Sequence, residues 1–148
     1  MANAFSEAFT EGFEQVVLVG SDIPDLPPHF LHDAFSALDR EGAALGPASD
    51  GGYYLIAFRK SAFLPEAFEN ISWSTEKVLQ QTLAAFKKNN KPVRLLTPWQ
   101  DVDTAEDLAA LSTRHPTEDG AAPRTLAYLR KMPEDWEAEQ LGGETNAS

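Results

Sequence analysis

The sequence predicts an α/β fold, in which helices flank a sheet that contains parallel strands. The first indication is residues 16–19, an apolar and mostly β-branched run that is followed at once by Gly20. Such a run is typical of a strand buried on both faces, as in a parallel sheet under helices. The second indication is that segments with the spacing of an amphipathic helix alternate with short apolar runs. This alternation is typical of α/β proteins.

The elements expected near the N-terminus begin with a helix over residues 2–12, where alanines and phenylalanines recur at helical spacing. The strand at residues 16–19 follows it. A second helix is expected from Pro28 to Gly42, because proline is favourable at the first helical position and glycine at the C-terminal end. The short apolar stretch at residues 43–46 then predicts a second strand.

The expected elements continue with a strand at residues 53–58, which are rich in aromatic and branched side chains. A helix is expected over residues 76–88, with Ser74 as its N-cap. Residues 92–96 predict another short strand, and residues 105–113 predict a further helix.

Length and charge limit the function classes. The chain has 148 residues, which suits one domain, and a hydrophobic share of 43%, which suffices for a core. The formal net charge of −11 argues against a nucleic-acid binder and against docking on an anionic membrane. The sequence has no cysteine, no signal-peptide pattern and no apolar run long enough to span a bilayer. A soluble cytoplasmic protein is therefore expected.

The composition and patterning of the sequence change near His115. Residues 1–115 carry the regular patterns and predict one folded domain. Residues 116–148 begin with a polar, loop-like stretch and end with an acidic, glycine-containing one. They predict a C-terminal extension that is partly disordered.

Asp22 follows the predicted strand at residues 16–19. In open α/β sheets, ligands bind outside the carboxyl ends of the strands. A carboxylate at this place can hold a hard cation such as Mg²⁺ or Mn²⁺ beside a phosphate. It can equally make only an Asx-turn with the backbone that follows. The residues alone leave both interpretations open.

The segment Asp50-Gly51-Gly52 lies between two expected strands. It can be a plain hairpin turn, which is the more common occurrence. It can also be a loop where glycines admit a ligand close to the backbone, with Asp50 facing that ligand. Further along, Trp73 can belong to the core or line a pocket.

A capped helix start follows at Thr104, because Asp107 lies three positions further on. This cap explains Thr104 and Asp107 but gives no role to Asp101 and Asp103. Val102 lies between these two acids and can point inward while both carboxylates point the other way.

Four segments in order carry a resemblance to a known family: VVLVGSDIPDL, LGPASDGGYYLIAF, ISWST and PWQDVDTAEDL. With them the chain resembles the bacterial DUF2064 family of glycosyltransferase-like proteins, which is related to the nucleotide-diphospho-sugar transferases of the GT-A fold. The resemblance covers about residues 2–115. It implies a Rossmann-like GT-A sheet flanked by helices. It also implies a nucleotide sugar or a nucleoside triphosphate as partner, bound with Mg²⁺ or Mn²⁺.

Site residues follow from the same resemblance, position by position. Asp22 and Asp103 match the acids that approach the metal. Asp50 matches an acid on the acceptor side and is the candidate catalytic residue, which would orient or deprotonate an acceptor hydroxyl. The remaining candidates are substrate-binding: Ser21, Gly51, Gly52, Tyr53 and Trp73.

The activity implied is metal-dependent glycosyl transfer, in which the cation stabilises charge on the leaving diphosphate. Two alternatives stay open. One is nucleotidyl transfer on the same fold, and the other is a non-catalytic binding or assembly module.

The chain departs from the family at its N-terminus. Family members begin with a strand and a phosphate- and base-binding loop that contains Gly, Lys and Arg, and this sequence shows neither ahead of residue 16. The resemblance therefore implies the C-terminal portion of a GT-A domain. A sheet without those strands leaves residues 16–19 with an unpaired edge, and it leaves Phe5, Phe9 and Phe13 without packing partners. We expect such a chain to form a homo-oligomer or to be poorly stable.

Overall fold

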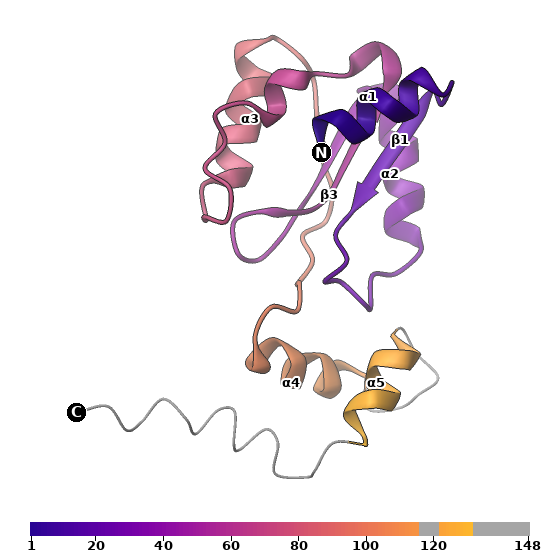
Figure 1. The fold of residues 1–148 in the computed structure, drawn as a ribbon, viewed down its shortest axis with the longest axis vertical. Coiled ribbons are helices and arrows are strands. Elements are labelled where there is room, and N and C mark those ends of the chain that lie inside the picture. Colours follow the sequence, from indigo (N-terminus) through magenta and orange to yellow (C-terminus); the bar gives the residue numbers. More distant parts are fainter. Residues whose placement is uncertain (116–121, 132–148) are drawn as a thin grey trace, which may run out of the picture. The chain divides into compact units, whose positions relative to one another are not determined.

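The computed structural model describes residues 1–115 and 122–131 (Figure 1). The chain forms two compact units. The first comprises Met1–Gly20 and Pro28–Trp99, and the second comprises Ser21–Pro27 and the residues from Gln100 onward. Most of the predicted C-terminal extension, residues 116–121 and 132–148, lies outside the described residues.

The first unit is built on a mixed four-stranded sheet with the order β1-β3-β2-β4. Strand β3 pairs antiparallel with both β1 and β2, whereas β2 and β4 run parallel. The α/β prediction is confirmed, but parallel pairing is limited to one pair of strands among the described residues. The strands are β1 (Gln15–Val19), β2 (Ala43–Pro47), β3 (Tyr53–Arg59) and β4 (Arg94–Leu95).

Strand β1 differs from its prediction as a strand buried on both faces. It lies at the edge of the sheet and is half-buried along most of its length, and Val19 is 42% exposed. Val16 and Leu18 pack against the core cluster, but β1 pairs with β3 on one side only. A four-residue apolar run is typical of a strand with covered faces, but it does not show how many strands flank it or how deeply each face is buried.

Three helices complete the first unit close to their predicted positions: α1 (Ala2–Thr10), α2 (His29–Arg40) and α3 (Val78–Lys88). Two short 3₁₀ helices, η1 (Lys60–Ala62) and η2 (Pro65–Phe68), follow β3. The predicted N-cap of α3 is wrong, because Lys77 holds that position and makes no side-chain cap. Ser74 instead has a φ of +61° in the preceding loop.

The aromatic core of the first unit explains why α1 is not left without partners. Phe5 is fully buried and its ring meets Phe58 edge-on, with centroids 5.1 Å apart. Phe9 is 6% exposed and its ring lies 5.3 Å from that of Phe63. The expectation that these rings lack neighbours is therefore wrong for Phe5 and Phe9. Phe13, beyond the end of α1, is 58% exposed.

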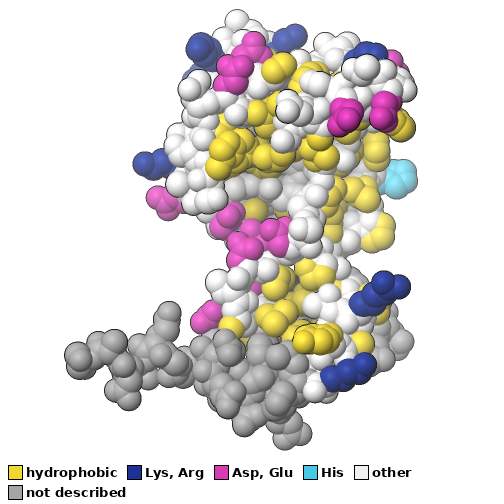
Figure 2. Space-filling model, viewed as in Figure 1, with side chains coloured by type: hydrophobic (Ala, Val, Ile, Leu, Met, Phe, Trp, Pro, Cys, Tyr) yellow, Lys and Arg dark blue, Asp and Glu magenta, His cyan; other side chains and the backbone are white. Residues whose placement is uncertain are grey.

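Apolar side chains are also exposed over β1 and α2, at the right of the first unit (Figure 2).

The second unit contains α4 (Ala105–Arg114) and α5 (Pro123–Leu129). A small cluster centred on Leu111 and Leu126 holds these two helices, with Val102 packed against it. No helix among the described residues is long and apolar enough to cross a membrane.

Candidate functional site

Two acids precede α4 in the second unit. One carboxylate oxygen of Asp101 and one of Asp103 lie within 4.8 Å of each other. Asp101 is half-buried and Asp103 is exposed, while Val102 between them packs against the α4–α5 cluster. The alternating arrangement therefore gathers two carboxylates on the side opposite Val102.

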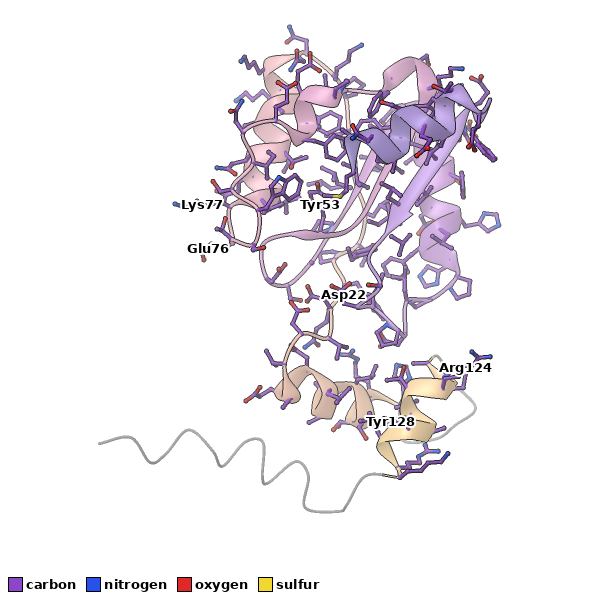
Figure 3. All side chains as sticks on the ribbon, in the orientation of Figure 1. Asp22, Tyr53, Glu76, Lys77, Arg124 and Tyr128 are labelled. Carbon is purple, nitrogen blue, oxygen red and sulfur yellow. The ribbon has the colours of Figure 1, made fainter. Side chains whose placement is uncertain are left out.

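The loop Ser21–Pro27 lies beside these acids. The Val102 N–H donates to the backbone carbonyl of Asp22 at 2.8 Å. Asp22 itself is exposed (Figure 3). This backbone hydrogen bond brings the residue predicted from the first loop next to the segment that carries Asp101 and Asp103.

A buried ion-pair network fixes the other end of the same loop. Asp25 is 1% exposed, and its Oδ2 lies 3.2 Å from Arg114 Nη2 and 3.0 Å from His115 Nε2. Arg114 also donates to Gln100 Oε1, and Gln100 Nε2 donates to Asp107 Oδ1 at 2.9 Å. We call Asp25, Arg114 and His115 the loop clamp, because they tie the Asp22 loop to the C-terminal end of α4.

The N-terminus of α4 is a complete capping box, as predicted. The Asp107 N–H donates to Thr104 Oγ1, and the Thr104 N–H donates to Asp107 Oδ2 at 3.0 Å. The Asp103 N–H donates to the same oxygen at 3.2 Å. The Asp107 carboxyl thus fixes the backbone at Asp103, one of the candidate metal ligands.

These bonds also set the charge state of Asp107. Burial acts to raise the pKa of its carboxyl, but hydrogen bonds from Thr104 and Gln100 and from two backbone N–H groups outweigh burial and lower the pKa. Because folding lowers this pKa, the cap stabilises α4 above the pKa of the unfolded chain. That stabilisation is lost as pH falls through the pKa of the folded state.

The Asp50 loop lies in the first unit and is the β2–β3 hairpin, so the interpretation as a turn is confirmed. The Gly52 N–H donates to Asp50 Oδ1 at 2.7 Å, and the Ala48 N–H donates to the Gly52 carbonyl at 3.1 Å. Asp50 remains exposed. The expectation that Asp50 acts on an acceptor hydroxyl stays a prediction.

Gly51 has a packing role that its sequence context does not show. Its φ is +88°, and the Leu79 N–H donates to its carbonyl at 3.0 Å. A Cβ atom here would lie 2.4 Å from the backbone oxygen of Glu76. The hairpin therefore needs glycine because the backbone before α3 passes directly over it (Figure 3).

The other predicted substrate-binding residues have varied surroundings. Ser21 is exposed in the second unit. Trp73 is 44% exposed in the loop before α3. Tyr53 packs against the aromatic core, and burial raises its pKa to about 12. Its hydroxyl is buried, and the nearby Thr82 side chain acts to lower that pKa without outweighing burial. Their roles in binding stay predictions.

Sequence reasoning missed the loop clamp and left Asp101 without a role. The contact between Asp25 and His115 joins residues 90 positions apart, which no local spacing predicts. One signal was available, because Asp25 stands between Pro24 and Leu26 in an otherwise apolar segment. A carboxylate in such a place needs a partner if the segment is buried.

Similarity to known proteins identifies the family of this chain. The family described as "Uncharacterized protein conserved in bacteria (DUF2064)" matches residues 1–75, which is half of the chain. The chain belongs to this family. The DUF2064 chain also resembles a crystal structure from Desulfovibrio desulfuricans G20, described as a "putative nucleotide-diphospho-sugar transferase". No curated protein matches it.

The likeness to that crystal structure is close. The TM-score is 0.81 at 39% sequence identity, and the match covers 95% of the DUF2064 chain. The chain spans 60% of the length of the Desulfovibrio protein. Over the part that the two chains share, the fold is therefore that of the Desulfovibrio protein.

Proposed function

We propose that this DUF2064 chain acts in metal-dependent glycosyl transfer from a nucleotide sugar, with Asp22, Asp101 and Asp103 as the metal ligands. The observation that carries the proposal is the pair of carboxylate oxygens of Asp101 and Asp103, within 4.8 Å of each other beside the Asp22 backbone. The description of the Desulfovibrio protein supports the reaction class.

The donor set fits a hard divalent cation. All three candidate ligands offer carboxylate oxygens, and oxygen ligands are those that Mg²⁺ and Mn²⁺ prefer. Two oxygens at the observed separation can reach one ion directly or through a bound water. A cation held there by these acids would supply positive charge that stabilises the negative charge on the leaving group.

Other side chains have separate tasks in the proposal. The loop clamp and the Asp107 cap hold the backbone segments that carry the three acids. Asp50 orients an acceptor hydroxyl or accepts its proton. Tyr53 does not act as the base, because its raised pKa keeps the buried hydroxyl protonated near neutral pH.

Calorimetric titration with Mn²⁺ tests the proposed metal set. We expect Asp103→Asn and Asp101→Asn each to weaken Mn²⁺ binding by at least ~10-fold, because each removes a charged oxygen ligand. Glu106→Gln is the matched control, since Glu106 is an exposed acid in the first turn of α4. Wild-type protein that binds no Mn²⁺, or variants that bind it as well as the control does, would contradict the site.

Asp50 can be tested by separating its charge from its role in the hairpin. Asp50→Asn keeps an acceptor for the Gly52 N–H, whereas Asp50→Ala removes it and costs about 1 kcal/mol of folding free energy. If Asp50 acts on the acceptor hydroxyl, both variants lose sugar transfer although only Asp50→Ala lowers the melting temperature. Transfer is measured by release of nucleoside diphosphate from a panel of nucleotide sugars. Full turnover by Asp50→Asn would leave the hairpin a structural element only.

A further inference from the structure

Val102 belongs both to the candidate metal site and to the small core of the second unit. Its N–H donates to the Asp22 carbonyl at 2.8 Å, and its neighbours in the chain are Asp101 and Asp103. Its side chain is half-buried and packs against the cluster that holds α4 and α5 together. The placement of Val102 therefore bears on the residues that carry all three candidate ligands.

The core of the second unit is small within the part of the chain that the structure describes. Its buried members come from α4, from α5 and from the residue before α5: Leu111, Ala122, Leu126 and Leu129. Val102 and Leu108 pack against them, and Leu108 itself lies on α4. Val102 is therefore the member of the cluster that joins the acid-bearing segment to the two helices. In so small a core, each apolar contact is a large share of the stability.

The two carboxylates before α4 depend on Val102 for their direction. Asp101 and Asp103 are bonded directly to this residue, and their carboxylates gather on the side opposite its packed side chain. A shift or rotation of Val102 therefore moves both of them together. Mg²⁺ and Mn²⁺ bind oxygen ligands within a narrow range of distances, so a small displacement of two ligands at once weakens binding.

The packing of Val102 also acts against the charge of its neighbours. Carboxylate oxygens of Asp101 and Asp103 lie within 4.8 Å of each other, so the two groups repel when both are ionised. Packed against the helices, Val102 holds the segment in place despite this repulsion. A bound cation would replace the repulsion by attraction to both acids. Cation binding and helix packing therefore favour the same arrangement of residues 101–103.

We propose that Val102 is a positioning residue, through which the packing of α4 and α5 sets the affinity of the site for a divalent cation. The inference deepens the proposed function and rests on it, because it requires Asp101 and Asp103 to be metal ligands. Such coupling is reciprocal. If the packed helices raise the affinity for the cation, a bound cation stabilises the packed helices in turn.

Calorimetric titration with Mn²⁺ measures the first direction of this coupling. Val102→Ala removes two methyl groups from the cluster and no metal ligand, and it should weaken Mn²⁺ binding about 10-fold. Val102→Ile keeps a β-branched apolar side chain and should bind Mn²⁺ more tightly than Val102→Ala does. Val93→Ala is the matched control, since Val93 is a half-buried valine packed against the core of the first unit. It should bind Mn²⁺ as the wild type does.

Hydrogen exchange with and without Mn²⁺ measures the second direction. At a Mn²⁺ concentration of about 100 times the dissociation constant, exchange of the α4 and α5 amides should slow by up to about 100-fold. Amides of β3, in the first unit, should not change. This measurement also covers a Val102→Ala variant whose helices open without the cation, because excess Mn²⁺ should restore their protection.

The possible results separate the role of Val102 from the proposed function. Wild-type protein that binds no Mn²⁺ would overturn both. If the wild type binds Mn²⁺ and Val102→Ala binds it equally well, the proposed ligands stand and the role of Val102 is wrong. Mn²⁺ binding that leaves the exchange of α4 and α5 amides unchanged has the same meaning.

Discussion

Asp25→Ala is expected to destabilise the second unit by about 3 kcal/mol, a large share of the stability of a small domain. The Asp25 side chain is fully buried and meets two donors, Arg114 and His115. Those donors remain partly exposed, at 32% and 23%, so water compensates them in part when the carboxylate is removed. The cost therefore lies at the lower end of that for breaking a buried ion pair.

Native-state hydrogen exchange of the α4 amides measures this loss separately from unfolding of the first unit. Asp25→Asn keeps the shape of the side chain, so it should lose less stability than Asp25→Ala. Glu106→Ala, an exposed acid on the same helix, should change stability by only ~0.5 kcal/mol. Equal protection of α4 in Asp25→Ala and Glu106→Ala would show that the loop clamp does not hold this helix.

The clamp also links stability to the proposed metal site. Asp25 lies three residues after Asp22, whose carbonyl accepts the Val102 N–H. Loss of the clamp frees the end of this loop and should weaken Mn²⁺ binding without removing a ligand. Supporting partners of metal ligands typically change affinity by about 10–100-fold.

The helices and most strands could be predicted because their signals are local. The apolar spacing of α2, the capping box at Thr104 and Asp107 and the aromatic run of β3 each lie within a few residues. The order of the strands could not be predicted, because it depends on pairing between Gln15 and Arg59, which are far apart in the sequence. Local patterns contain no information about such partners.

The aromatic core shows the same limit. Phe63 and Phe68 lie in a region that carries no helical or strand pattern, yet their rings meet Phe5. The prediction that α1 lacks partners failed for this reason. At the candidate site, the family resemblance singles out Asp22 and Asp103, and their role as metal ligands stays a prediction. The loop clamp could not be predicted, since its members come from opposite ends of the described chain.

Gly51→Ala is expected to destabilise the first unit by about 3 kcal/mol, because two costs add. The φ of +88° is a conformation that alanine adopts only with strain. The new Cβ would also lie 2.4 Å from the Glu76 backbone oxygen, and backbone cannot rotate away as a side chain can. To relieve this close contact the loop before α3 must move, which breaks the hydrogen bond from the Leu79 N–H to the Gly51 carbonyl.

Gly12→Ala isolates the first of these costs, because Gly12 has a φ of +102° but no atom within 4 Å of an added Cβ. The free energy of unfolding of this variant should fall only by the cost of the backbone strain, about 1–2 kcal/mol. Urea denaturation of both variants gives the difference, which is the contribution of the close approach between the hairpin and Glu76. If the two variants unfold at the same urea concentration, the hairpin tolerates a side chain at Gly51. That result would favour ligand access as the role of this glycine, which is one of the two interpretations that the sequence leaves open.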